Sequence, residues 1–241
     1  MIKCVSFDFD RTLAHVTPLI HHLVPKLLAE KGIHISVEEF KEKCIEMRIN
    51  LPSHLKESFS RFGTLPKDER NQFLMEYNKA RIAVLNLDIE DKEEITELKN
   101  WLAKQIFITQ KKILYEDVIP TIRKLDSLGM KQYILSGNHS DGIIELLEQA
   151  GIIDFFQELI TVDKYSPRKV RNFKILLDHS KYLPEDILHI GDDIITDGFG
   201  SKGYNINSII IRRPEQLVFV KENENDFPVI AELSELFNFI K

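Results

Sequence analysis

The first apolar run of the chain, from Ile2 to Phe9, predicts a short β-strand that is buried on both faces. Asp8 interrupts this run near its end, and Asp10 follows it directly. If the backbone is still extended at Phe9, the alternation of side chains places both carboxylates on the same side. Two carboxylates that lie close together repel, so either the pKa of one is raised or a cation binds both. The ordinary alternative is a strand that ends in a solvated turn.

Between residues 17 and 110, the apolar positions recur with the period of an α-helix, and no strand pattern interrupts them. Ser36 and Glu39 have the spacing of a capping box, which predicts the first turn of a helix. This region therefore predicts a helical module. Its four expected helices begin near residues 20, 36, 66 and 95.

After residue 111 the pattern changes to an alternation of helix and strand, which is typical of a parallel sheet with crossover helices. Strands are predicted over residues 131–136, 158–161, 186–191 and 207–212. Helices are predicted over residues 118–125, 143–149, 170–177 and in the tail, residues 229–241.

We therefore expect an α/β fold, a doubly wound parallel sheet with a smaller all-helical cap domain inserted after the first strand. The core would comprise residues 1–16 and 111–241, and the cap residues 17–110. In open parallel sheets, ligands bind beyond the carboxyl ends of the strands. An insertion that leaves the first strand at this end would lie over the ligand like a lid.

Polar residues gather at the ends of four predicted elements of the core. Each group alone is ordinary turn or surface chemistry, but together they suggest a site at one edge of the sheet. The groups are Asp8 and Asp10; Ser136, Gly137 and Asn138; Arg168 and Lys169; and Gly191, Asp192, Asp193 and Asp197.

These groups match, in order and at workable spacing, the four motifs of the haloacid dehalogenase-like (HAD) superfamily, which the chain resembles. The matching segments are DFDRT, LSGN, RK followed by a helix, and GDDIITD. The resemblance covers residues 1–16 and 111 to about 215, and it implies a HAD-like Rossmannoid core. The helical insertion is similar to the family's C1 caps in position and type. The activity implied is hydrolysis of a phosphate monoester.

The resemblance also implies roles for the acidic residues. Asp8 would be the nucleophile that becomes an aspartyl phosphate, and Asp10 the general acid and base. Asp8, Asp10 through its backbone carbonyl, and Asp192 would bind Mg²⁺. Asp193 and Asp197 would surround these ligands, and both remain candidates for a contact with the metal. Oxygen ligands with room for water and a phosphate favour Mg²⁺ over zinc or copper.

The remaining motif residues would bind the phosphoryl group. Ser136 would donate a hydrogen bond to its oxygens, next to Gly137 and Asn138, and Lys169 would neutralise charge on Asp8 and on the phosphoryl group. Phosphoryl transfer needs mainly positioning and charge cancellation, which such groups supply. The lysine of this motif is usually followed by proline, whereas Val170 follows Lys169, so Lys164 remains a candidate.

Composition narrows the partners. The formal net charge of −6 argues against binding nucleic acid by phosphate neutralisation. The two cysteines form no CxxC pair, so neither a disulfide framework nor a zinc-thiolate site is expected, and a reducing, cytoplasmic setting is the default. No apolar run approaches the roughly 18 residues of a membrane span. The expected partner is a small phosphorylated metabolite.

Several functions remain open beside a Mg²⁺-dependent phosphatase. A phosphosugar mutase would use the same core and differ in whether the cap admits water or a second phosphate. A dehalogenase of this family lacks the second aspartate, which is present here as Asp10. The non-enzyme alternative is a phosphate-binding or receiver-like signalling module, against which the helical insertion counts.

Overall fold

The computed structural model describes most of the chain, and the sheet and its helices lie within the described part. The described residues are 1–49, 53–62, 65, 66, 68, 69, 72, 73, 76, 92–166, 168–214 and 226–240. The helix expected to begin near residue 66 falls largely outside them.

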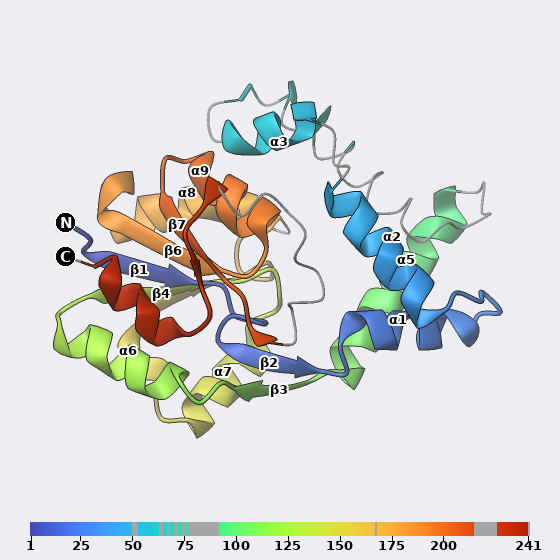
Figure 1. Ribbon diagram of the computed structural model, residues 1–241, viewed down its shortest axis with the longest axis horizontal. Coiled ribbons are helices and arrows are strands. Elements are labelled where there is room, and N and C mark those ends of the chain that lie inside the picture. Colours follow the sequence, from blue (N-terminus) through green and yellow to red (C-terminus); the bar gives the residue numbers. More distant parts are fainter. Residues whose placement is uncertain are drawn as a thin grey trace.

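Six strands, all paired in parallel, form a sheet in the order β5-β4-β1-β6-β7-β8 (Figure 1). Strand β1 lies between β4 and β6, so the direction of winding reverses beside it. This is the switch point at which doubly wound sheets bind ligands. The strands are β1 (Cys4–Phe7), β4 (Lys131–Leu135), β5 (Phe156–Ile160), β6 (Ile187–Gly191), β7 (Asn207–Ile211) and β8 (Val229–Ile230).

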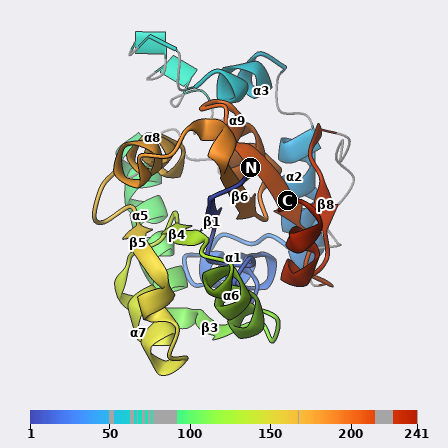
Figure 2. The same ribbon diagram turned by 90° about the vertical axis from the view of Figure 1, so that its left-hand side faces the viewer.

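Helices cover both faces of the sheet, and Figure 2 shows α6 on one side of β1, β4 and β6, with α8 and α9 on the other. The first face carries α6 (Val118–Ser127), α7 (Asp141–Gln149), η1 (Ile153–Phe155) and the 3₁₀-helix η6 (Leu233–Asn238). The second face carries α8 (Lys169–Ser180), the π-helix η3 (Ile194–Phe199) and α9 (Gly200–Lys202). The 3₁₀-turn η2 (Pro184–Asp186) precedes β6. The predicted doubly wound sheet is confirmed.

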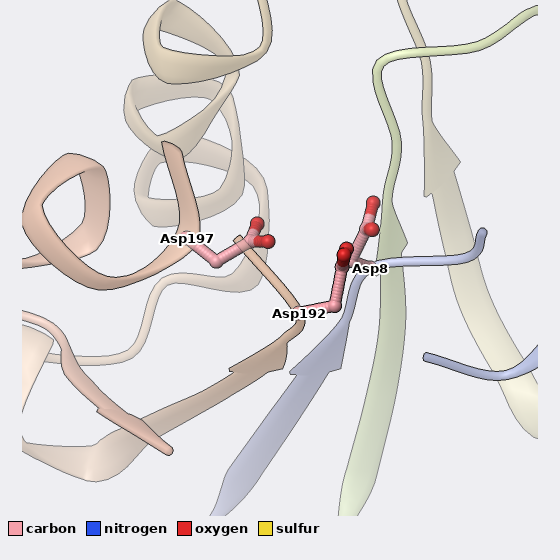
Figure 3. Close-up of side chains that lie close together, drawn as sticks. All are labelled: Asp8, Asp192 and Asp197. Atoms are coloured by element: carbon pink, nitrogen blue, oxygen red, sulfur yellow. The ribbon is translucent and has the colours of Figure 1, made fainter. Parts of the chain in front are cut away.

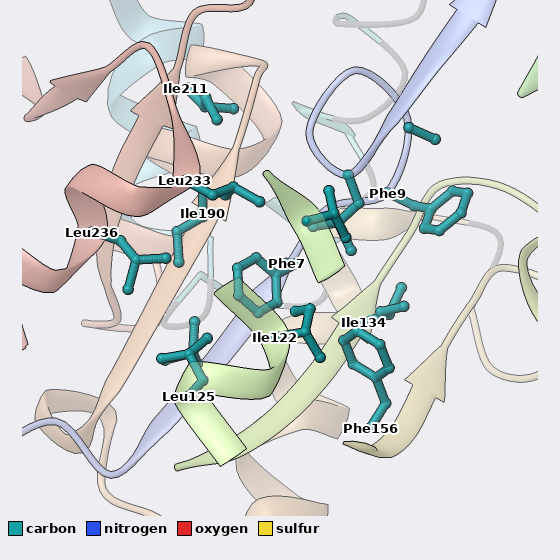
Figure 4. Packing of buried hydrophobic residues seen from close by; sticks show 14 of the residues in the cluster. Phe7, Phe9, Ile122, Leu125, Ile134, Phe156, Ile190, Ile211, Leu233 and Leu236 are labelled. Carbon is teal, nitrogen blue, oxygen red and sulfur yellow. The ribbon is translucent and has the colours of Figure 1, made fainter. Parts of the chain in front are cut away.

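Strand β1 divides its side chains between the two faces. Val5 and Phe7 belong to the cluster under α6, which Figure 4 shows around Phe7, whereas Cys4 belongs to the cluster under α8. All three are fully buried, as a central parallel strand requires. The same alternation turns Ser6, and after it Asp8, toward the face of α8.

A two-stranded antiparallel ribbon connects the core to the helical insertion. It consists of β2 (Ala14–Thr17) and β3 (Lys111–Leu114). Neither strand was expected from the sequence, because each has only four residues and its partner lies more than 90 residues away in the chain. The ribbon leaves the core directly after the segment that holds Asp8 and Asp10.

Three helices of the insertion share an apolar core of their own, beyond the carboxyl end of β1 (Figure 1). They are α1 (Ile20–Ala29), α2 (Val37–Ile49) and α5 (Lys92–Thr109). The backbone N–H of Glu39 donates to Ser36 Oγ at 3.0 Å, as the capping pattern predicted. Leu28 and Phe40 are among the side chains buried between these helices.

The fourth described helix, α3 (Ser53–Ser60), packs on the core instead, next to α9 and η3 (Figure 1). Phe62 follows it and is fully buried, with its ring 5.7 Å from that of Phe73 and 6.5 Å from that of Tyr204. The insertion therefore touches the core through an apolar contact as well as through the ribbon.

The tail differs from the sequence prediction of a single helix over residues 229–241. Val229 and Ile230 extend the sheet as β8, paired with Ile210 and Ile211 of β7. Both residues are β-branched and complete the exposed edge of β7, which outweighs helix formation. Only the short 3₁₀-helix η6 follows, with Glu232 and Glu235 forming its capping box. Among the described residues, no helix is long and apolar enough to cross a membrane.

We predict that Phe62→Ala lowers the free energy of unfolding by about 3 to 5 kcal/mol, because a fully buried aromatic ring leaves a cavity. Phe107→Ala is the matched control, since the Phe107 side chain in α5 is 54% exposed, and its change should stay within about 0.5 kcal/mol. Urea denaturation followed by circular dichroism measures both. Equal stability of the two variants would contradict the docking of α3 on the core.

Candidate active site

Asp8 lies at the carboxyl end of β1, at the centre of the sheet. Its backbone N–H donates to the carbonyl of Ile190 at 2.8 Å, which continues the pairing of β1 with β6 by one residue. The alternation along β1 turns its side chain toward α8, and the residue is 7% exposed. Figure 3 shows its carboxylate beside those of Asp192, at the end of β6, and Asp197, in η3.

These three buried carboxylates offer oxygen atoms that all lie within 4.8 Å of one another. Burial raises the pKa of Asp8 well above its usual value; the nearby Lys169 opposes this rise, and the charges of Asp197 and Asp192 add to it. Burial also raises the pKa of Asp192, partly offset by Arg11. A hard cation would relieve this crowding, and an all-carboxylate donor set fits a divalent ion that prefers oxygen.

Lys169, the first residue of α8, lies between two of the carboxylates. Its Nζ is 2.5 Å from Asp8 Oδ1 and 2.5 Å from Asp197 Oδ1. Burial disfavours the charged amine, but the attraction of Asp197 and Asp8 outweighs it and raises the pKa of Lys169. Lys164, the alternative left open by the sequence, is exposed on the loop before α8.

Asp197 is fully buried and both of its oxygens have partners. Besides Lys169, Oδ1 lies 3.1 Å from His189 Nε2, and Oδ2 accepts a hydrogen bond of 3.0 Å from the backbone N–H of Asp193. Burial opposes ionisation of Asp197, but Lys169 and His189 outweigh it and hold its pKa below the usual range. The contacts of Asp197 suit a residue that holds Lys169 in place.

Two residues behind Asp197 were not predicted from the sequence. His189 Nδ1 lies 2.9 Å from Ser6 Oγ, so that β1 and β6 support Asp197 through a buried chain of polar contacts. Burial lowers the pKa of His189, which favours the neutral imidazole. The available signal was a histidine at an alternating position inside an otherwise apolar strand.

Gly191, the last residue of β6, makes room for Asp197. A Cβ atom at Gly191 would lie 2.2 Å from Asp197 Cγ, where no real contact is possible. Asp193 begins the following helix, and its Oδ1 accepts hydrogen bonds from the N–H groups of Ile195 and Thr196 at 2.9 and 3.0 Å. In the segment GDD, Gly191 therefore leaves space for Asp197, Asp192 contributes a carboxylate to the cluster, and Asp193 caps the following helix.

The residues after β4 lie at the same edge of the sheet. Ser136 is fully buried, and its Oγ accepts a hydrogen bond from Asn138 N–H at 3.2 Å, which orients the hydroxyl. The position of a Cβ on Gly137 would lie 3.9 Å from Lys169 Cδ. Asn138 Nδ2 donates to Asp10 Oδ2 at 2.6 Å. Ser136, Gly137 and Asn138 thus adjoin both Lys169 and the DFDRT segment.

The DFDRT segment turns sharply after Asp10. Arg11 has a φ of +62°, a conformation that favours glycine, and its Nε lies 3.2 Å from Asp192 Oδ2. Attraction to Asp192 is the main cause that raises the pKa of Arg11. On the other side of the turn, Lys112 Nζ lies 2.6 Å from Asp10 Oδ1. Lys112 comes from β3 and was not among the predicted residues.

Two consecutive arginines after β7 also hold the acidic loops, and the sequence analysis missed both. Arg212 donates from Nη1 to the backbone carbonyl of Asp192. Arg213 donates from Nη2 to the carbonyl of Thr12 at 2.8 Å and pairs through both of its terminal nitrogens with Asp117. No motif announces such contacts, because they depend on where the backbone carbonyls of distant loops lie.

Comparison with known proteins gives a consistent result. A family model described as haloacid dehalogenase-like hydrolase matches residues 2–198. A glyceraldehyde 3-phosphate phosphatase of Methanopyrus kandleri is 24% identical over 241 residues, which cover 95% of this chain and 91% of that protein. An enolase-phosphatase E1 of Anopheles gambiae is 25% identical over 126 residues, 51% of this chain and 42% of that protein.

The fold also resembles solved structures. One is assigned as a haloacid dehalogenase-like hydrolase of Bacteroides fragilis and superposes with a TM-score of 0.67 at 20% sequence identity. The superposition covers 98% of this chain and all of that one. The arrangement of sheet and helices is therefore shared along nearly the whole length.

We predict that Gly191→Ala destabilises the fold and displaces Asp197 from Lys169, because the new methyl group and the Asp197 carboxylate would occupy the same space. We expect a loss of about 1 to 3 kcal/mol in the free energy of unfolding. Gly142→Ala is the control, since a Cβ in α7 at this position meets nothing within 4 Å and should be neutral or stabilising. A Gly191→Ala variant as stable as the parent would show that η3 adjusts freely.

Proposed function

Because the chain belongs to the haloacid dehalogenase-like hydrolases, we propose that it is a phosphatase that hydrolyses a small phosphate monoester through an aspartyl phosphate on Asp8. One observation carries the proposal: a buried carboxylate at the switch point of the sheet lies 2.5 Å from a buried lysine, within a cluster of three carboxylates. The lysine, together with a cation held by the carboxylates, would neutralise the negative charge on the oxygens of a phosphoryl group.

In the proposed mechanism, Asp8 attacks phosphorus while the bond to the leaving oxygen breaks, and Asp10 protonates that oxygen. Water then attacks the phosphorus of the aspartyl phosphate while Asp10 takes up its proton, and the P–O bond to Asp8 breaks, which releases phosphate and the Asp8 carboxylate. Ser136 and the segment through Gly137 and Asn138 bind the phosphoryl oxygens. Lys169 offsets the charge of both the nucleophile and the phosphoryl group.

Asp8, Asp192 and the backbone carbonyl of Asp10 would hold Mg²⁺ in this mechanism. The ion would supply charge neutralisation at the phosphoryl oxygens. Asp193 and Asp197 would support these ligands, because Asp193 caps η3 and Asp197 has partners on both oxygens. Arg11 would remain beside Asp192 and orient its carboxylate.

We also propose the division into a core, residues 1–16 and 111–241, and a helical domain, residues 17–110, that selects the substrate. The location of α1, α2 and α5 beyond the end of β1 supports this division. The relative of Methanopyrus kandleri, with its three-carbon phosphate substrate, supports a small phosphorylated metabolite. The reducing, cytoplasmic setting expected from two cysteines without a CxxC pair remains part of this proposal.

The first test is phosphate release from a panel of phosphorylated metabolites, with glyceraldehyde 3-phosphate included, in Mg²⁺ and in a chelator. We expect turnover that requires Mg²⁺ and that Asp8→Asn abolishes. In a thermal scan, Mg²⁺ at a hundredfold its dissociation constant should stabilise the parent by about 2.7 kcal/mol and Asp8→Asn less. Activity that survives chelation would refute the metal assignment, and transfer of phosphate without release would indicate a mutase.

A second prediction separates the two functions assigned to Asp10. Asp10→Asn keeps the backbone carbonyl and loses the carboxyl, so Mg²⁺ affinity should change little while alkyl phosphates react roughly 10²- to 10⁴-fold more slowly. With p-nitrophenyl phosphate, whose leaving group needs little protonation, Asp8 should still be phosphorylated, and a stoichiometric burst should precede slow turnover. Rapid quench with trapping of the acyl phosphate measures the burst and the phosphorylation of Asp8. If Asp10→Asn hydrolyses both substrates at the rate of the parent, Asp10 is not the general acid and base.

A further inference from the structure

The carboxylate of Asp10 is held on both oxygens by side chains from two other segments. Asn138 Nδ2 donates to Oδ2 at 2.6 Å, and Lys112 Nζ lies 2.6 Å from Oδ1. A hydrogen bond to one oxygen and an ion pair at the other together hold the carboxylate in place. Asn138 belongs to the LSGN motif, whereas Lys112 belongs to no motif.

The geometry of β3 directs Lys112 to this position. Along β3, Lys112 and Leu114 are partly buried, whereas Lys111 and Ile113 are exposed, as expected when side chains alternate between two faces. The Lys112 ammonium lies 5.7 Å from the ring centroid of Phe9, so the side chain reaches over the DFDRT segment. Only 19% of the Lys112 side chain is exposed, unlike that of a solvated surface lysine.

Three cations make ion pairs with different carboxylates of the site. Lys169 contacts Asp8 and Asp197, and Arg11 contacts Asp192. Lys112 contacts Asp10, with its Nζ 2.6 Å from Oδ1. Lys112 therefore does not duplicate Lys169, because Lys169 contacts the nucleophile Asp8 and Lys112 contacts a different carboxylate. Its contact is with the group to which the proposed mechanism assigns proton transfer.

We propose that Lys112 is a positioning residue that aligns the Asp10 carboxylate for proton transfer to the leaving oxygen and from the attacking water. The proposal rests on the function given above, in which Asp10 is the acid and base. Proton transfer requires the carboxyl oxygen within hydrogen-bond reach of the reacting oxygen, and a displacement of about 1 Å can cost 10²-fold in rate. Since β3 is the strand that returns from the helical insertion, this alignment depends on the ribbon as well as on the core.

The test compares Lys112→Met with Lys111→Met, which removes a neighbouring ammonium from the opposite face of β3. First-turnover phosphorylation of Asp8 is measured by rapid quench with glycerol 2-phosphate and with p-nitrophenyl phosphate. We expect Lys112→Met to slow the alkyl phosphate roughly 10- to 100-fold and p-nitrophenyl phosphate less than about threefold. KM and Mg²⁺ affinity should stay unchanged. Lys112→Arg should recover most of the loss, and Lys111→Met should behave as the parent.

Three results would overturn the proposal. Equal losses on both substrates with a raised KM would make Lys112 a substrate-binding residue, and no difference between Lys112→Met and Lys111→Met would leave it without a role. Crystal structures of the two variants give a readout that needs no turnover. Asp10 should leave Asn138 Nδ2 in Lys112→Met only. Retention of the 2.6 Å contact there would refute the alignment, even if the parent hydrolyses neither compound and the proposed function fails.

Discussion

The contact of one lysine with two buried carboxylates is the interaction on which the rest of the site depends. Asp8, Asp192 and Asp197 are brought within 4.8 Å of one another although each is almost inaccessible to water. Without a cation among them, burial and mutual repulsion would force protonation or unfolding. Lys169 supplies that cation on the side of α8, and its own charge is retained because two carboxylates face it.

This electrostatic requirement explains several features that otherwise look unrelated. Gly191 has no Cβ because Asp197 must approach the end of β6. His189 and Ser6 place buried polar atoms of β6 and β1 behind Asp197. Arg212 fixes the carbonyl of Asp192 from the neighbouring strand. The sheet is thus a mainly apolar scaffold in which Ser6 and His189 support the carboxylate cluster, whereas the buried Gln132 of β4 donates to the carbonyl of Ile122.

The sequence predicted the sheet well and brought the acidic motif residues to one edge of it, since both depend on local patterns. Continuous apolar runs located β1, β4, β6 and β7, and the acids that follow β1 and β6 placed Asp8 and Asp192 at one edge. The ribbon, β8 and the docking of α3 were not predicted, because each depends on a partner distant in the chain. Lys112, His189, Arg212 and Arg213 were missed for the same reason. A lysine in a four-residue strand has no pattern that reveals which carboxylate it will meet.

The docking of Phe62 has a consequence for how the chain can be engineered. An insertion joined to the core only by a ribbon could be exchanged for another module by cutting at the ribbon. Here, excision would also uncover Tyr204, whose ring lies 6.5 Å from that of Phe62 in the same apolar cluster. A transplanted module would have to supply an apolar side chain that covers that surface. The modular boundary that the chain order suggests is therefore not a boundary in the packing.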